Sequence, residues 1–335
     1  MKIVIHGDWF DCQVIRDRIF LWDTYGCLRV LDIRQRVYDL IKEHGYQINV
    51  SIHKDALDKF VISTLRIKGG IYPVDSAYMG DHLYTATETG LYRRYLQEGN
   101  NIAEMPKGLV RKLIDIRFLE LTAKSDMIAM AGASEGLFEL YNPRKYRITK
   151  SGHEINEVGK GIYSVIRTYT KAAWYDKHDI ISVNQEGNQY RSRFNTNTKP
   201  DASGKILRNY IKQNLIGELN ARMQSVRQTN QFESREVFLN IQIDERGTKE
   251  FHFLMRHFEE PVKIAGKPRR YAFGAFGMAA ESKQEQVVVC KNGAVKRIDG
   301  PITRSRVVSG FGKRNGLLVV VRNDHVMITD CENEE

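Results

Sequence analysis

Residues 132–141 (GASEGLFELY) place a glycine turn between two short apolar runs. The run MIAMA at residues 127–131 precedes the turn and LFELY at residues 137–141 follows it, which is the pattern of a β-hairpin. The same phrase recurs along the whole chain. Seven candidate hairpins have their turns at Gly26, Gly90, Gly136, Gly187, Gly247, Gly293 and Asp324.

The spacing of these turns predicts a repeat architecture. Successive turns lie between 31 residues apart, from Gly293 to Asp324, and 64 residues apart, from Gly26 to Gly90. Propeller blades repeat about every 40 to 50 residues. Residues 286–290 and 317–321 are apolar without alternation, as expected of strands covered on both faces. A parallel α/β sheet would need a helix after almost every strand, and the sequence predicts only three helices. We therefore expect an all-β fold over residues 1–335, a single seven-bladed β-propeller, with six or eight blades as alternatives.

Helical insertions are predicted at about residues 34–65 and 203–228. The first would hold two helices, at residues 35–44 and at about 55–65. The second would hold a helix over residues 206–226, whose apolar residues recur at spacings of four and three. That stripe would pack on the propeller or dock a partner protein through Leu207, Ile211, Leu215 and Leu219. Residues 2–7 read as a lone strand, which we expect to complete the last blade.

Residues 133–142 (ASEGLFELYN) and 24–32 (TYGCLRVLD) resemble the segment of WD40 repeats that joins the third strand to the fourth. The paired Gly-His and Trp-Asp signatures of those repeats are absent from this sequence. The resemblance implies a divergent WD40-like propeller.

The chain is basic, with 51 Lys and Arg against 41 Asp and Glu and a formal charge of +10. Residues 261–314 hold twelve of the basic side chains against three acidic ones, a local net charge of +9. Such a field attracts polyanions without reading their sequence. The alternative is a protein that is merely basic, with no anionic partner.

Two basic segments are the candidate binding sites. Residues 143–147 (PRKYR) and 266–271 (GKPRRY) combine basic side chains with tyrosine and are predicted to be loops because Pro and Gly interrupt them. Arginine beside an aromatic ring can pair with phosphates and stack on unpaired bases. Alternatively, these side chains pair with acids of neighbouring blades. The residues concerned are Arg144, Lys145, Arg147, Lys267, Arg269 and Arg270.

Catalytic, metal and cofactor signatures are sparse. His6 lies next but one to Asp8, and His178 adjoins Asp179, yet no nucleophile or third orienting group accompanies either pair. His252 and His257 have no further ligand nearby, and no phosphate-binding loop occurs. We therefore expect no catalytic residues, no metal and no cofactor.

Compartment signals are also few. The four cysteines form no CxxC pair, which indicates reduced thiols. No stretch resembles a signal peptide or reaches the roughly 20 apolar residues of a membrane span. These features favour a cytoplasmic location, or a nuclear one in a eukaryote.

The sequence thus favours a non-catalytic scaffold that binds protein subunits of a larger assembly, with RNA or DNA as a further partner of residues 261–314. One alternative is a hydrolase or lyase-type enzyme that uses the central channel of the propeller, with His6, Asp8, His178 or Asp179 as acid or base. Another is a sensor of a small ligand.

Overall fold

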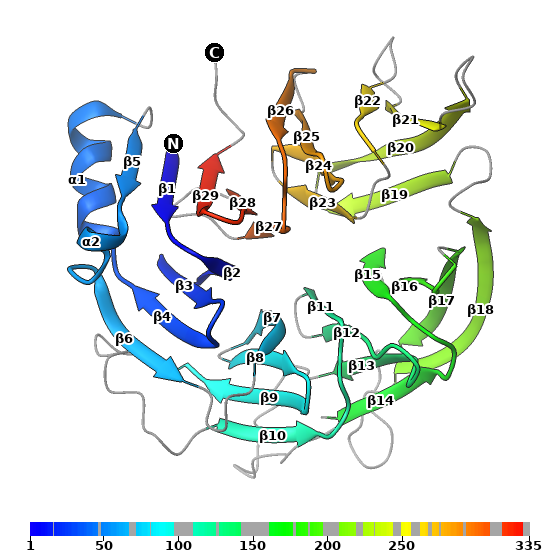
Figure 1. Cartoon of the computed structure of the whole chain (residues 1–335). Coiled ribbons are helices and arrows are strands. Elements are labelled where there is room, and N and C mark those ends of the chain that lie inside the picture. The colour runs from blue at the N-terminus through cyan, green and yellow to red at the C-terminus, as the bar shows by residue number, and fades with distance from the viewer. Residues whose placement is uncertain are drawn as a thin grey trace, which may run out of the picture. The chain divides into compact units, whose positions relative to one another are not determined.

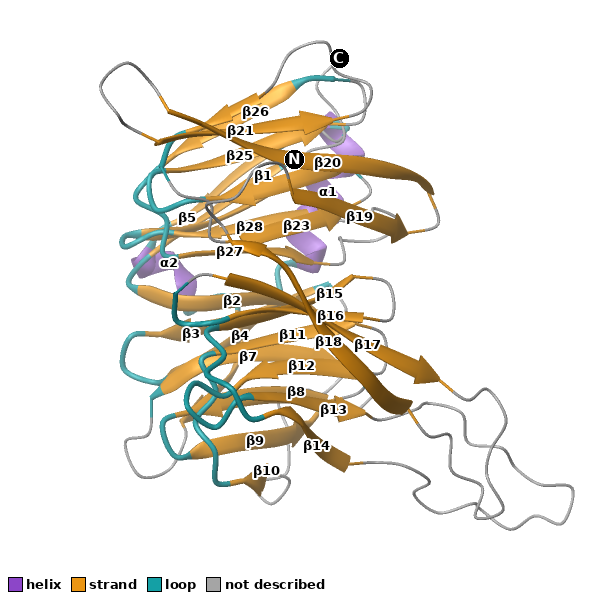
Figure 2. Cartoon of the chain, turned by 90° about the vertical axis from the view of Figure 1, so that its right-hand side faces the viewer, coloured by secondary structure: helices purple, strands orange, loops and turns teal. Residues whose placement is uncertain are grey.

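The strands of the computed structural model pair into seven sheets. The structure describes residues 1–15, 17–45, 48–66, 72–80, 82–96, 110–124, 127–141, 161–176, 179–186, 188–196, 208–218, 224–230, 232–243, 249–255, 262–266, 270–274, 276–290, 293–308 and 317–330. Figure 1 shows that the sheets follow one another along the chain, with one exception that joins the two chain ends. Figure 2 shows how little of the chain is helical. The predicted all-β propeller is therefore confirmed.

The chain divides into two compact units, and the first is built mainly from residues 1–72 and 237–335. Two of its sheets are antiparallel meanders. They are formed by β2 (Trp9–Ile15), β3 (Arg18–Asp23), β4 (Cys27–Leu31) and β6 (Val61–Arg66), and by β23 (Arg270–Gly274), β24 (Gly277–Glu281), β25 (Glu285–Cys290) and β26 (Val295–Asp299).

The second unit is built from residues 73–100 and 105–236. Its sheets are formed by β7 (Pro73–Met79), β8 (His82–Thr87), β9 (Gly90–Tyr95) and β10 (Val110–Ile114), by β11 (Glu120–Lys124), β12 (Met127–Ala131), β13 (Leu137–Tyr141) and β14 (Gly161–Ile166), and by β15 (Ala172–Asp176), β16 (Asp179–Val183), β17 (Asn188–Thr196) and β18 (Arg208–Glu218).

A further sheet contains β19 (Gln224–Asn230), β20 (Phe232–Ile243), β21 (Lys249–Met255) and β22 (Val262–Ile264).

The seventh sheet joins the chain ends. It contains β27 (Arg304–Val308), β28 (Leu317–Val321), β29 (His325–Asp330), β1 (Lys2–His6) and β5 (Asn49–Ile52), in that order. β1 runs antiparallel to β29 and parallel to β5. Its apolar side chains Ile3 and Ile5 are fully buried in the same cluster as Val319 and Ile328. The N-terminal strand is therefore held on both edges by segments distant in sequence.

The insertion between β4 and β6 supplies β5 together with α1 (Arg34–His44) and α2 (Lys54–Leu57). Val37 of α1 and Leu57 of α2 are buried in the same core cluster as β1. The insertion thus covers the sheet that contains both chain ends. Neither of these helices, the two in the described residues, has the length and apolar character to cross a membrane.

Two helix predictions are wrong. The helix expected at about residues 55–65 ends at Leu57, and β6 begins at Val61. Residues 61–64 (VIST) include β-branched side chains, which favour a strand, and β4 offers an edge for them to pair with.

The helix expected over residues 206–226 is a strand where the structure describes it. β18 pairs antiparallel with β17, and Ile211 and Leu215 belong to this strand; Leu207 and Leu219 lie outside the described residues. The pairing shifts register at Gln189/Tyr190 and again at Arg193/Phe194. Each shift interrupts the two-residue alternation of a strand, so the apolar spacing imitates that of a helix.

Gly136, in the turn that enters β13, gives a test of the hairpin pattern. Its φ is +102°, and a Cβ there would collide with the carbonyl oxygen of Ile166 on β14. Gly80 has a φ of +63° with open space around it. We expect Gly136→Ala to lower the free energy of unfolding by about 3 kcal/mol, and Gly80→Ala by about 1 kcal/mol. Urea denaturation of both variants measures the difference, and equal losses would show that the close contact does not matter.

Candidate functional site

The buried charges of the protein are mostly negative. Among the described residues, eight carboxylates and two guanidiniums are buried. These are Asp11, Asp23, Asp75, Glu120, Glu139, Glu281, Glu285 and Asp330, against Arg18 and Arg304. The ten groups contribute a formal −6 to the total of +10, so the remaining residues carry +16. The interior is acidic, and the rest of the chain is more basic than its net charge suggests.

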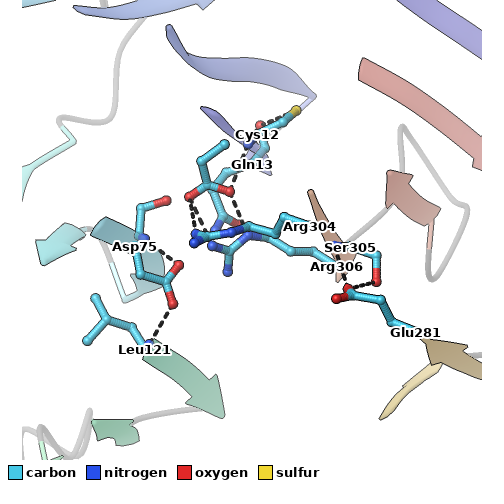
Figure 3. A network of polar contacts seen from close by, with 10 residues as sticks. Cys12, Gln13, Asp75, Leu121, Glu281, Arg304, Ser305 and Arg306 are labelled. Carbon is cyan, nitrogen blue, oxygen red and sulfur yellow. Dashed lines mark hydrogen bonds and ion pairs between the residues drawn. The ribbon is translucent and has the colours of Figure 1, made fainter. Parts of the chain in front are cut away.

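Asp11 of β2 is the centre of a buried polar network. Its carboxylate is fully buried and accepts two hydrogen bonds from Arg306 of β27, each 2.9 Å long. Arg304, also on β27, lies 3.3 Å from the same carboxylate, and its guanidinium stands 5.0 Å from the centre of the Phe10 ring. Figure 3 shows the two arginines extending side by side from β27. A bidentate arginine and a second cation stabilise a buried carboxylate that would otherwise be costly.

Glu281 of β24 makes the same kind of link between sheets. It accepts hydrogen bonds from the backbone N–H and the hydroxyl of Ser305 on β27, at 2.8 and 2.6 Å (Figure 3). The carboxylates of β2 and β24 are therefore both satisfied by donors from β27.

The second unit repeats this arrangement. Asp75 of β7 accepts the backbone N–H of Leu121 on β11 at 2.7 Å, and Glu139 of β13 accepts the hydroxyl of Tyr175 on β15 at 3.0 Å (Figure 3 shows the first). In each case a carboxylate of one sheet bonds to a strand of another. These acids hold the sheets together, which leaves them poorly suited to proton transfer with a substrate.

Three histidines gather where β1, β5 and β29 meet. The ring of His6 stacks on His53 with centroids 4.5 Å apart, lies 6.1 Å from His325, and places Nε2 3.1 Å from the hydroxyl of Ser51. The carboxylate of Asp324 bonds to His325, at 2.8 Å, rather than to His6. Because no carboxylate among the described residues bonds to His6, which contacts the serine, these described residues do not form a nucleophilic triad. The described residues contain no cluster suited to a metal ion.

The surroundings of Cys12 do not favour a nucleophile. Burial raises the pKa of its thiol well above the usual value, and the adjacent Asp11 raises it further, while Arg306 acts in the opposite direction. A thiol that stays protonated is unreactive.

No known protein family matches the sequence, and no curated protein matches it. Solved structures do. The N-terminal domain of Nup159 is similar over 96% of this chain and 89% of its own, with 10% identity and a TM-score of 0.51. A chain of the mitotic checkpoint complex is similar over 97% and 90%, with 8% identity and a TM-score of 0.51. The fold is that of a β-propeller.

The propeller fold alone does not choose a function. An ancestral GH74 enzyme is similar over 98% of this chain and 49% of its own, with 9% identity and a TM-score of 0.53. Enzymes and subunits of complexes thus share this architecture.

Five of the six basic residues predicted to bind a partner lie outside the described residues. They are Arg144, Lys145, Arg147, Lys267 and Arg269. Arg270 does not belong to a loop as predicted, because it is the first residue of β23, opposite Glu281 in the register. The apolar and aromatic residues that follow it, Tyr271 to Phe273, favour a strand that begins directly after the Pro-containing segment.

The structure describes three of the four residues proposed as acid or base in the alternative enzyme. His6 belongs to the histidine group, and Asp8 is exposed. Asp179 lies 3.6 Å from the guanidinium of Arg191, and His178 is outside the described residues.

Sequence reasoning missed the buried carboxylates of the propeller. A signal for one of them exists, since Glu139 interrupts the apolar stretch predicted at residues 137–141. An acid in such a stretch must find donors inside the fold.

Asp11 therefore carries a stability prediction. Asp11→Asn keeps the size of the side chain and removes the charge that Arg304 and Arg306 face, and we expect a loss of about 3 kcal/mol in the free energy of unfolding. The matched control is Asp8→Asn, an exposed acid three residues earlier, with a change within about 0.5 kcal/mol. Denaturant unfolding measures both, and a similar result for the two would mean that the network is not structural.

Proposed function

We propose that this propeller is a non-catalytic scaffold that binds an acidic protein partner within a larger assembly. The observation that carries the proposal is the separation of charge between the interior and the rest of the chain. Eight acids of the described residues are buried, so the net positive charge of the chain belongs to its other residues, and we infer that part of it faces a partner. A field of this kind raises the rate of encounter with acidic surfaces.

The proposed contacts are the basic segments at residues 143–147 and 266–271. They would present Arg144, Lys145, Arg147, Lys267, Arg269 and Arg270 to the partner. The partner helix expected over residues 206–226 has no part in the proposal, because β18 occupies the described portion of that range.

Support for a role without catalysis comes from the surroundings of the candidate acids and bases. Asp11, Asp75, Glu139 and Glu281 accept hydrogen bonds from other strands. In the part of the chain that the structure describes, the nearby carboxylate of Asp324 bonds to His325 and none bonds to His6, and the thiol of Cys12 is buried. Nucleic acid is the competing partner, since phosphates respond to the same charge.

Affinity capture from cells that express the protein tests the proposal. We expect protein partners that remain after nuclease treatment and are released at about 0.5 M salt, because high salt screens exposed charge pairs. Release by nuclease would show instead that nucleic acid is the partner. Capture of nothing under either condition would contradict the scaffold.

The triple variant R144E/K145E/R147E localises the contact. Its matched control is R36E/K42E/K54E, which makes the same charge change at exposed positions on and beside the helical insertion. We expect the first variant to lose most of its partner and the second to keep it. Equal behaviour would mean that residues 143–147 do not form the contact.

A further inference from the structure

The outer two strands of the sheet β7–β10 concentrate positive charge. Arg93 and Arg94 lie on β9, and Arg111 and Lys112 lie on β10. Arg93 and Arg111 stand directly opposite each other in the register. Like charges in directly opposed positions destabilise a sheet. This pairing therefore costs stability unless an anion lies beside it.

The described residues supply little negative charge to these side chains. Lys112 pairs with Asp115 and stands 5.8 Å from the ring of Tyr92, and Arg93 hydrogen-bonds to Tyr84. In the described part of the chain, neither Arg94 nor Arg111 forms an ion pair. Arg111 is exposed, whereas Arg94 is half-buried and burial lowers its pKa. The guanidinium of Arg111 is thus open to an external carboxylate or phosphate, and that of Arg94 is partly accessible.

β10 is the outermost strand of its sheet. No described strand pairs with its outer edge, so an extended chain could add there through backbone hydrogen bonds. Arg93 and Arg111 share one face of the sheet, and Arg94 and Lys112 share the other. A chain added beside β10 would meet positive charge on both faces. It would therefore need acidic side chains at consecutive positions rather than at alternate ones.

We propose that the outer edge of β10 binds an extended acidic segment of a partner protein as an additional strand. Carboxylates on one face of that segment pair with Arg111 and Arg93, and those on the other face pair with Arg94 and Lys112. The proposal rests on the proposed scaffold function and names its partner as a run of consecutive Asp and Glu residues.

The aromatic residues of these strands favour a peptide over single-stranded nucleic acid. Tyr92 contacts Lys112 and lies 3.3 Å from the Thr89 hydroxyl, and Tyr95 packs against His82 with ring centroids 5.2 Å apart. Neither ring is strongly exposed. Sequence-tolerant binding of single strands needs open aromatic faces for bases to stack on.

Fluorescence anisotropy with a labelled peptide of twelve alternating Asp and Glu residues tests the proposal. We expect Arg111→Glu to weaken binding about tenfold, because it replaces attraction by repulsion. Arg36→Glu, the same charge change on exposed α1, should weaken it less than about twofold. If both variants behave alike, or if the wild-type protein does not bind the peptide at low salt, the proposal is wrong.

A second probe distinguishes strand addition from simple charge attraction. The same peptide with N-methyl groups at every second residue, made in both frames, keeps its charge and loses backbone donors. We expect at least one frame to bind about tenfold more weakly. Equal binding of all three peptides would overturn the added strand. Tighter binding of oligouridine than of the acidic peptide would assign the surface to nucleic acid.

Affinity capture with Arg111→Glu separates this proposal from the scaffold function. If the wild-type protein captures partners and the variant captures the same ones equally well, the scaffold stands and the β10 edge is not its contact. If the wild-type protein captures none, the scaffold is wrong, and the peptide titration alone decides the β10 edge.

Discussion

A carboxylate taken out of water must find hydrogen-bond donors, and in this protein the donors come from a different sheet. Asp11 reaches β27, Asp75 reaches β11, and Glu139 reaches β15. Sheets that pack through apolar side chains alone can slide against one another, whereas a buried charge with directed donors fixes their relative position. The same bonds tie these three carboxylates to the stability of the fold.

The sheet that contains both chain ends depends on a second device. β1 has no neighbour close in sequence and is held by β29 on one edge and β5 on the other. The insertion that carries β5 also brings α1 and α2 against the core of that sheet. Because β5 pairs with β1, β1 is an internal strand of the sheet and not its outer strand.

Much of the fold could be predicted because its signals are local. Residues 127–131 and 137–141 pair in full register around a glycine whose φ is positive, and α1 lies where apolar spacing places it. The strand β18 could not be recognised, because two bulges disturb its alternation. The carboxylate links were invisible for another reason. Their partners lie 46 residues away for Asp75 and 295 residues away for Asp11, and no local pattern specifies such contacts.

A double-mutant cycle between Asp11 and Arg306 is the most direct test of the account. Unfolding free energies of Asp11→Asn, Arg306→Met and the double variant would give the coupling between the two side chains. We expect a coupling of about 2 kcal/mol, because removing either side chain alone leaves the other buried without its charged partner. In a matched cycle between the exposed Asp8 and Arg306, the free-energy changes of the two substitutions should be additive. A coupling near zero for Asp11 and Arg306 would contradict the claim that buried carboxylates hold the sheets of this propeller together.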